Sequence, residues 1–240
     1  MYSKEFQDIV EFRRSNRWFD AEVNVPDEVV SKSLDRAVLS PNSSNLQLWE
    51  FHWIKSPGEL DRFVPLCLSQ RAARSAKHMV VFVTRQDKWR ERARWNFNMI
   101  KSTVVGEPDK LQKGAMDYYG KVIPLVYAND PFGFMSLVRR SISFFMSLRK
   151  PFYRAGGKAK QRIVVHKSCA LAAQTFMLSV AAEGFHTCPM EGIDEVRVRK
   201  ALKLPGGAEI NMIVAVGKGT EEGVWGPRFR VANEEVIFVH

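Results

Sequence analysis

The spacing of apolar residues predicts two helices near the start of the chain. Apolar side chains between residues 4 and 14 recur at helical spacing. A second predicted helix opens at Pro26 and Asp27, and a Ser-Pro-Asn sequence at residues 40–42 stops it. Its apolar stripe consists of Val29, Val30, Leu34, Ala37 and Val38.

Runs rich in β-branched and aromatic residues predict the strands. The expected strands are residues 50–54, 79–84, 210–216 and, at the end of the chain, 236–239. The runs at 79–84 and 210–216 are apolar without interruption, which is typical of strands covered on both faces. We therefore expect both of them to be buried.

Residues 166–183 form a long predicted helix that Gly184 would cap. Between 170 and 182 the helix is apolar on nearly every face, so it must be buried on most sides. It belongs either to the centre of the core or to a subunit interface.

Residues 90–160 are interpreted as a partly helical insertion that forms a lid within one domain spanning residues 1–240. The stretch 132–152 is both basic and aromatic. A packed helix with snorkelling arginines and a helix on a membrane surface both fit this pattern. The packed helix is the preferred interpretation.

Composition and charge narrow the class of protein. A chain of 240 residues can bury a sizeable core, and 45% hydrophobic with 26% charged residues is typical of globular proteins. The net charge of +10 favours anionic partners, which include nucleic acid, anionic lipid and phosphorylated cofactors. No helix-turn-helix, zinc-finger or RNP-like motif supports nucleic acid, and we expect none to bind.

The absence of targeting signals predicts a cytoplasmic protein. The first ten residues are mixed in polarity, and we find no apolar stretch of about 18 residues, so neither a signal peptide nor a membrane span is expected. Cys67, Cys169 and Cys188 share no CxxC spacing. Reduced thiols are therefore expected, without a disulfide or a metal site.

Four short clusters could carry chemistry. The first, at residues 13–17, combines three arginines with a serine at the end of a predicted helix. Guanidinium forks match the geometry of a phosphate, although a solvated basic helix end has the same composition. The second cluster is a polar loop at residues 40–51, which runs directly into a strand.

The remaining clusters lie late in the chain. Residues 184–194 contain Pro189, which fixes the backbone, and Gly192, which permits close approach to a ligand. Asp194 is suited to cap a helix over 195–202. In the fourth cluster, at residues 225–230, Arg228 and Arg230 would point the same way if the segment is extended.

Taken in order, these clusters resemble the nitroreductase (flavin reductase-like) family. The matching segments are RRSNRWFD at 13–20, SPNSSNLQLWEF at 40–51, HMVVFVT at 78–84, GFHTCPMEGID at 184–194, INMIVAVG at 210–217 and the late PRFR. The resemblance implies an α+β fold with a central, mostly antiparallel sheet flanked by helices and a helical insertion. It also implies an intertwined homodimer that holds FMN at its interface.

The resemblance assigns candidate cofactor-binding residues to each cluster. The basic motif would contact the flavin phosphate, ribityl chain and ring, the late arginine pair would contact the phosphate, and the polar loop would come from the partner subunit. The Pro-x-Glu-Gly turn would lie beside the ring near N5. These residues are Arg13, Arg14, Ser15, Arg17, Asn42, Ser43, Ser44, Asn45, Pro189, Met190, Glu191, Gly192, Arg228 and Arg230.

The sequence departs from the family pattern at two places. Leu48 stands where many relatives have proline before the tryptophan of the polar loop. Gln70 and Arg71 occupy the region where many relatives place an Asn and a Lys facing the ring, and they are the candidates for that role. Aromatic residues of the insertion could cover the substrate, namely Tyr118, Tyr119, Phe132 and Phe134.

The implied activity is the reduction of nitroaromatic, quinone or related conjugated electrophiles by NAD(P)H in a ping-pong cycle. The chemistry would be centred on the flavin, so no catalytic side chain is expected. A flavin-binding carrier or sensor without turnover is the alternative. The lid residues Asp117, Tyr118 and Lys121 only loosely echo those of flavin-dependent dehalogenases.

Overall fold

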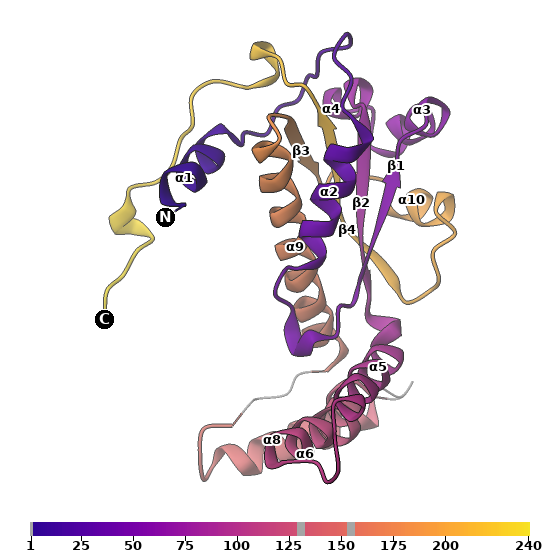
Figure 1. Ribbon diagram of the computed structural model, residues 1–240, viewed down its shortest axis with the longest axis vertical. Helices are drawn as coiled ribbons and strands as arrows, with labels where there is room; N and C mark the ends of the chain where they lie inside the picture. Colours follow the sequence, from indigo (N-terminus) through magenta and orange to yellow (C-terminus); the bar gives the residue numbers. More distant parts are fainter. Residues whose placement is uncertain (1, 129–132, 153–156) are drawn as a thin grey trace.

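A computed structural model of the protein describes residues 2–128, 133–152 and 157–240 (Figure 1). Its centre is a sheet of four strands in the order β1-β2-β4-β3, in which every neighbouring pair is antiparallel. The strands are β1 (Trp49–Ile54), β2 (His78–Arg85), β3 (His186–Met190) and β4 (Ala208–Gly217). The expected α+β fold is confirmed.

Helices cover both faces of the sheet. On one face, α2 (Asp27–Val38) and α9 (Lys158–Ala182) pack against β2 and β4 through residues such as Phe82 and Phe176. On the other face lie α3 (Pro57–Leu66), α4 (Arg71–Ser75) and α10 (Glu195–Ala201), with Phe63 at the centre. Phe63, Phe82 and Phe176 are all fully buried. Replacing any one of them by alanine would lower the free energy of unfolding by about 3–5 kcal/mol.

Helix α9 begins eight residues before the expected start, and Gly184 follows it with a φ of +78°. That left-handed conformation confirms the predicted cap. In length and composition, α9 is a helix that could cross a membrane. However, half of its most apolar 18-residue stretch is buried inside the protein. It packs along α2 and the sheet (Figure 1), as expected of a core helix.

The insertion forms a separate lobe at one end of the sheet (Figure 1). It contains α5 (Trp89–Ser102), α6 (Lys110–Asp117), α7 (Ile123–Tyr127) and α8 (Phe134–Ser147), and a π-helical turn (Tyr118–Val122) joins α6 to α7. A small core holds the lobe to the polar loop and to the start of α9. It consists of Leu46, Leu48, Ala93, Ile123, Tyr127 and Val165.

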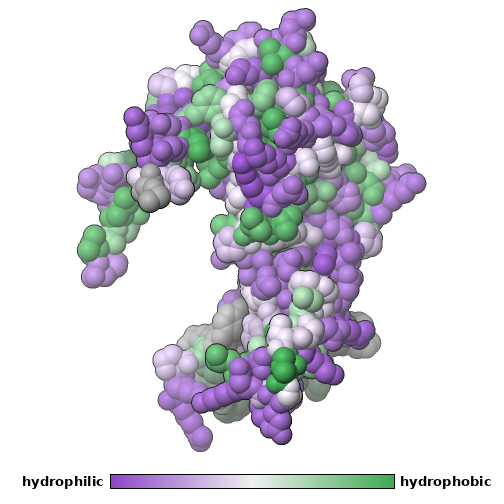
Figure 2. Space-filling model, in the orientation of Figure 1, coloured by the Kyte–Doolittle hydropathy of each residue, from purple (hydrophilic) through white to green (hydrophobic). Residues whose placement is uncertain are grey.

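Two segments extend away from the sheet on the same side. They are α1 (Ser3–Phe12) and the tail that follows β4, and both termini lie there (Figure 1). Between this pair and the lower lobe the surface is hollowed (Figure 2). The expected terminal strand at residues 236–239 is wrong for the isolated chain, because these residues are exposed and form no β-pairing.

Candidate functional site

The end of α1 and the C-terminal tail bring four arginines together. Arg13 follows the last turn of α1, and burial together with the nearby charges of Arg228, Arg230 and Arg14 lowers its pKa. Within the part of the chain that the structure describes, no carboxylate lies within 4.0 Å of these four guanidinium groups. A group of unpaired cations is suited to bind an anion such as a phosphate.

Arg228 also has a structural role that the sequence did not indicate. Its guanidinium donates to the backbone oxygens of Glu11 at 2.8 Å and Arg13 at 2.9 Å, which lie at the C-terminal end of α1. These carbonyls have no partner within the helix, and a cation there also favours the helix dipole. Arg228 thereby fixes the end of α1 against the tail.

A buried asparagine organises the backbone between Arg13 and Trp18. Asn16 is 1% exposed, and its side chain accepts from the backbone N–H of Trp18 and donates to the carbonyl oxygen of Thr220. Gly219 and Gly223 pack so closely that a Cβ at either position would lie 2.3 Å or less from Asn16 atoms. Asn16 was absent from the predicted site, yet it shapes the loop that carries the predicted residues.

Ser15 and Arg17 flank this asparagine and lie near the start of β3. Ser15 forms a parallel bridge with Thr187 of β3. The guanidinium of Arg17 lies 4.3 Å from the ring centroid of Trp225. Burial raises the pKa of the Cys188 thiol, and the nearby charge of Arg17 opposes that rise. Arg17 therefore sits between the tail and β3, next to the Pro-x-Glu-Gly turn.

The segment before α4 reaches the same turn from the other side. Gln70 donates through Nε2 to the carbonyl oxygens of Gly192 at 2.7 Å and Cys67 at 3.1 Å. The two residues before it, Leu68 and Ser69, both have a φ of +52°. Non-glycine residues in this region carry backbone strain, which often accompanies functional sites.

Arg71 begins α4, and its guanidinium lies 5.1 Å from the ring centroid of Trp18. Trp18 belongs to the loop that Asn16 organises. Arg71, one of the two residues predicted to face the ring, therefore lies next to the basic motif. The backbone N–H of Phe19 also donates to Ser75, at the end of α4.

The predicted turn residues differ in what they can offer a ligand. Met190 is 2% exposed and packs in the core, so only its backbone can contribute. Pro189 lies in β3 opposite Val214, whereas Glu191 follows the strand and is exposed. β3 is absent from the strands expected from the sequence, because a short strand that contains proline has a weak signal.

The polar loop lies at the opposite end of the sheet. Trp49, which follows the loop, pairs with Thr84, and Thr84 pairs with Glu209, whereas Thr187 beside Ser15 pairs with Val216. Glu209 and Val216 are seven positions apart on β4, which corresponds to roughly 23 Å at about 3.3 Å per residue. The loop and the basic motif of one chain therefore do not meet.

Strain and hydrogen bonds hold the polar loop in a defined shape. Ser44, Asn45 and Gln47 have φ values of 57°, 47° and 49°. Asn42 accepts from the backbone N–H of Gln47, and the backbone N–H of Ser43 donates to Ser168. Three such residues in one loop cost free energy and indicate a constrained binding segment.

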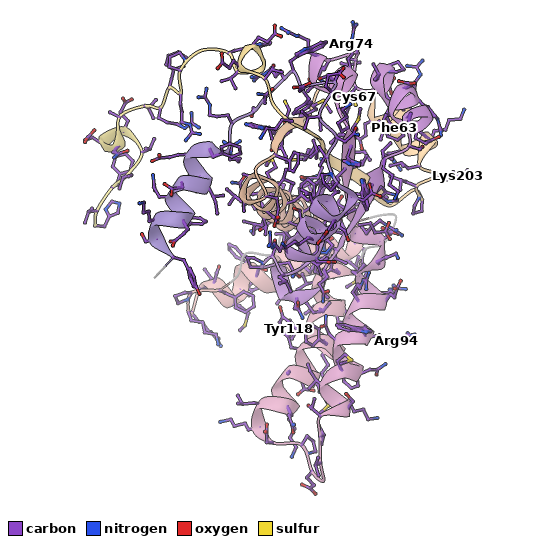
Figure 3. All side chains as sticks on the ribbon, turned by 45° about the horizontal axis from the view of Figure 1, so that its top comes forward. Phe63, Cys67, Arg74, Arg94, Tyr118 and Lys203 are labelled. Atoms are coloured by element: carbon purple, nitrogen blue, oxygen red, sulfur yellow. The ribbon has the colours of Figure 1, made fainter. Side chains whose placement is uncertain are left out.

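The insertion contacts this loop directly. The hydroxyl groups of Ser44 and Tyr118 are 2.6 Å apart, and the Tyr119 hydroxyl donates to the Ser44 carbonyl oxygen at 3.0 Å. Figure 3 shows Tyr118 on the lower lobe, far from Cys67 and Arg74 at the other end. A cavity of about 410 Å³, lined in part by Ser43, Tyr118 and Tyr127, opens here.

Phe134, another predicted substrate residue, does not line this cavity: it lies on α8 and is 65% exposed. The remaining one, Phe132, lies outside the described residues. The three thiols are buried and unpaired; burial raises the pKa of Cys67 to about 11 and that of Cys169 to about 12. Such thiols are protonated and unreactive near neutral pH.

Comparisons with known proteins agree with this geometry. The model of the nitroreductase family matches residues 10–218. The protein DrgA of Synechocystis is 27% identical over 216 residues, covering 90% of this chain and 84% of DrgA. The crystal structure of Bacillus subtilis YdfN superimposes with a TM-score of 0.76 at 19% identity, covering 99% of each chain.

A protein of Exiguobacterium sibiricum crystallised in complex with FMN has a TM-score of 0.67 and 19% identity, and the match covers 98% of this chain and 97% of that one. These structural matches show the fold, and the family model spans most of the sequence. The resemblance seen in the clusters is thereby confirmed, and the chain belongs to the nitroreductase family.

Proposed function

We propose that the protein is a homodimeric, FMN-dependent oxidoreductase that uses NAD(P)H to reduce nitroaromatic, quinone or related conjugated electrophiles. Membership of the nitroreductase family supports this chemistry. The observation that carries the proposal is the convergence of unpaired arginines, the Gln70–Gly192 contact and the loop organised by Asn16 at one end of the sheet.

The residues present fit the phosphate of FMN. Arg13, Arg14 and Arg230 offer guanidinium donors that face no carboxylate in the described chain. Both terminal nitrogens of Arg228 already donate to backbone oxygens at the end of α1, so we assign it chiefly to positioning Arg13. Burial and, after it, repulsion from Arg228, Arg230 and Arg14 lower the Arg13 pKa, and a phosphate would relieve this repulsion.

The ring side of the site has its own candidates. Arg17, and secondly Arg71, would place a fixed cation beside the pyrimidine edge, where reduction adds negative charge. A backbone N–H near Glu191 and Gly192 would bind N5, and the Gln70 side chain holds this turn in place. A bound FMN would accept hydride from NAD(P)H and deliver electrons to the second substrate in a ping-pong cycle.

The dimer would complete the site from the other subunit. Because Asn42, Ser43, Ser44 and Asn45 lie far from the basic motif of their own chain, we assign them to the flavin bound on the partner. Apolar residues of α1, α9 and the tail are exposed in the single chain, and a partner would bury them. They include Phe6, Phe12, Ile163, Leu171 and Phe238.

The lid would then cover the acceptor. Tyr118 and Tyr119 are hydrogen-bonded to Ser44 of the polar loop. A flavin contacted by this loop would therefore lie beside the two tyrosines. The adjoining cavity of about 410 Å³ has the size of a small-molecule site. We propose that the acceptor enters there.

An absorbance experiment tests the proposed function. The purified protein would be incubated with FMN, desalted, and titrated with NADH or NADPH without oxygen. We expect flavin bands that co-elute with protein and bleach on addition of the nucleotide, and that return when a quinone or nitroaromatic is added. Bound flavin that never bleaches would favour a carrier or sensor, and absence of bound flavin would refute the site.

A further inference from the structure

Helix α8 packs on the protein through its polar side. The side that faces the rest of the lobe carries Ser136, Arg139 and Ser143. Arg139 is 3% exposed and Ser143 is 4% exposed. The opposite side is apolar and open to solvent: Phe134 is 65%, Leu137 62%, Phe145 66% and Leu148 68% exposed. This is the reverse of the usual orientation of an amphipathic helix on a folded core.

Buried hydrogen bonds fix this orientation. The guanidinium of Arg139 donates to the backbone oxygens of Leu125 and Ala128, which lie at the C-terminal end of α7, and to Ser136. Turning the apolar side inward would expose Arg139 and leave these carbonyls without a donor. The energetic cost of such orphaned groups keeps the apolar side pointing outward.

The charge of the chain is concentrated around the same helix. Residues 88–160 contain 15 lysines and arginines and five acidic residues, whereas the remainder of the chain has 21 of each. The segment therefore carries the whole net charge of +10. Between residues 131 and 182 there is no aspartate or glutamate, and the exposed Arg140, Arg149 and Lys150 flank the apolar side of α8.

We propose that α8 docks the protein on an anionic membrane surface. An apolar helix face bordered by cations is suited to lie at a lipid interface, where anionic headgroups attract the cations. Helix α8 lies at the lower end of the molecule (Figure 1), and its apolar side chains are exposed there. A second copy of this chain is a poorer occupant, because a symmetric contact would oppose the same cations.

Vesicle co-sedimentation of the full-length protein tests the proposal. The vesicles would contain phosphatidylcholine alone or phosphatidylcholine with phosphatidylglycerol. We expect binding only to the anionic vesicles, and weaker binding at high salt. The double variant Leu137→Ser/Phe145→Ser should bind at least tenfold more weakly, and Arg140→Glu/Lys150→Glu should lose binding in the same way.

Matched controls separate docking from misfolding. Leu111 is 84% exposed on α6, so Leu111→Ser should keep both vesicle binding and thermal stability. Each α8 variant should also keep the elution volume of the wild type. Failure of the wild type to bind, or equal binding to neutral vesicles, would overturn the proposal. It would equally be overturned if the α8 variants dissociate the oligomer, since a second copy would then cover the helix.

Discussion

Single side chains determine how the arginines of the site are presented. Arg13 lies in a group of like charges without a described counter-ion, and Asn16 fits between two glycines that leave no room for a Cβ. The first feature concerns ligand binding and the second concerns the shape of the loop. Substitutions can separate the two.

Replacing Arg13 by alanine should weaken FMN binding. Loss of a hydrogen bond to a charged group corresponds to about 1.5–3 kcal/mol, or roughly a 10- to 150-fold higher Kd. Flavin fluorescence titration measures this change. Arg62→Ala on α3 is the control, because its ion pair with Glu59 is on the surface and involves no residue of the proposed site. Equal affinities of wild type and Arg13→Ala would contradict the phosphate assignment.

Replacing Gly223 by alanine should destabilise the protein. The new Cβ would lie 1.9 Å from Oδ1 of Asn16 and 2.7 Å from the Trp18 carbonyl oxygen. Overpacking of this kind costs about 1–3 kcal/mol. Gly58→Ala is the matched control, because nothing lies within 4 Å of a Cβ there and the position is helical. Urea unfolding should show a lower midpoint for the first variant alone.

The buried thiols predict a loss of stability at alkaline pH. Burial raises the pKa of Cys169 to about 12 in the folded protein. The unfolded thiol titrates near 8.5, so its contribution is constant below that pH and falls as the pH rises toward 12. The free energy of unfolding should fall between pH 8 and pH 10 in both proteins. The fall should be roughly 1–2 kcal/mol smaller in Cys169→Ala than in wild type. Identical drops would refute the shift.

At the scale of helices and strands, most of the fold could be predicted from local patterns. Continuous apolar runs gave β2 and β4 to within two residues, and Asp194 does cap α10 by accepting from the backbone N–H of Arg197. The errors have physical causes. β3 is short and contains Pro189, while residues 158–165 of α9 are too mixed in polarity to signal a helix that tertiary packing stabilises.

The site could be predicted only as separate pieces. Sequence motifs identified the arginines and the turn, but the contact between Gln70 and Gly192 joins residues 122 positions apart. Similarly, Asn16 is a small polar residue whose importance depends on Gly219 and Gly223, which only the fold brings near. Contacts of this kind follow from topology and leave no local signal.

The contact between lid and polar loop is the element-scale feature that can be tested. Tyr119→Phe removes the hydrogen bond to the Ser44 carbonyl oxygen, which should cost about 1 kcal/mol of stability. Because Ser44 and its neighbours are strained, we also expect faster amide hydrogen exchange in residues 43–47. Tyr2→Phe at an exposed position is the control. Unchanged exchange in the loop would show that the lid does not restrain it.

At the scale of the whole molecule, the exposed tail is a segment that the proposed dimer would cover. The apolar residues Ile237 and Phe238 are 60% and 69% exposed. In an intertwined dimer they would be buried against the partner. Ile237→Ser/Phe238→Ser should therefore raise the dimer dissociation constant, as measured by analytical ultracentrifugation, whereas Leu111→Ser should not. Equal dissociation constants would leave the tail without a role in association.

The most direct test of a flavin site shared between subunits is complementation. At an FMN concentration near the wild-type Kd, a chain with Arg13→Ala and a chain with Ser43→Glu should each lose most of their FMN-dependent NAD(P)H oxidation as homodimers. Co-expressed, they form mixed dimers in which one site combines the intact Arg13 of one subunit with the intact loop of the other. About a quarter of the sites should then regain activity. No recovery in isolated mixed dimers would contradict a flavin site shared between subunits.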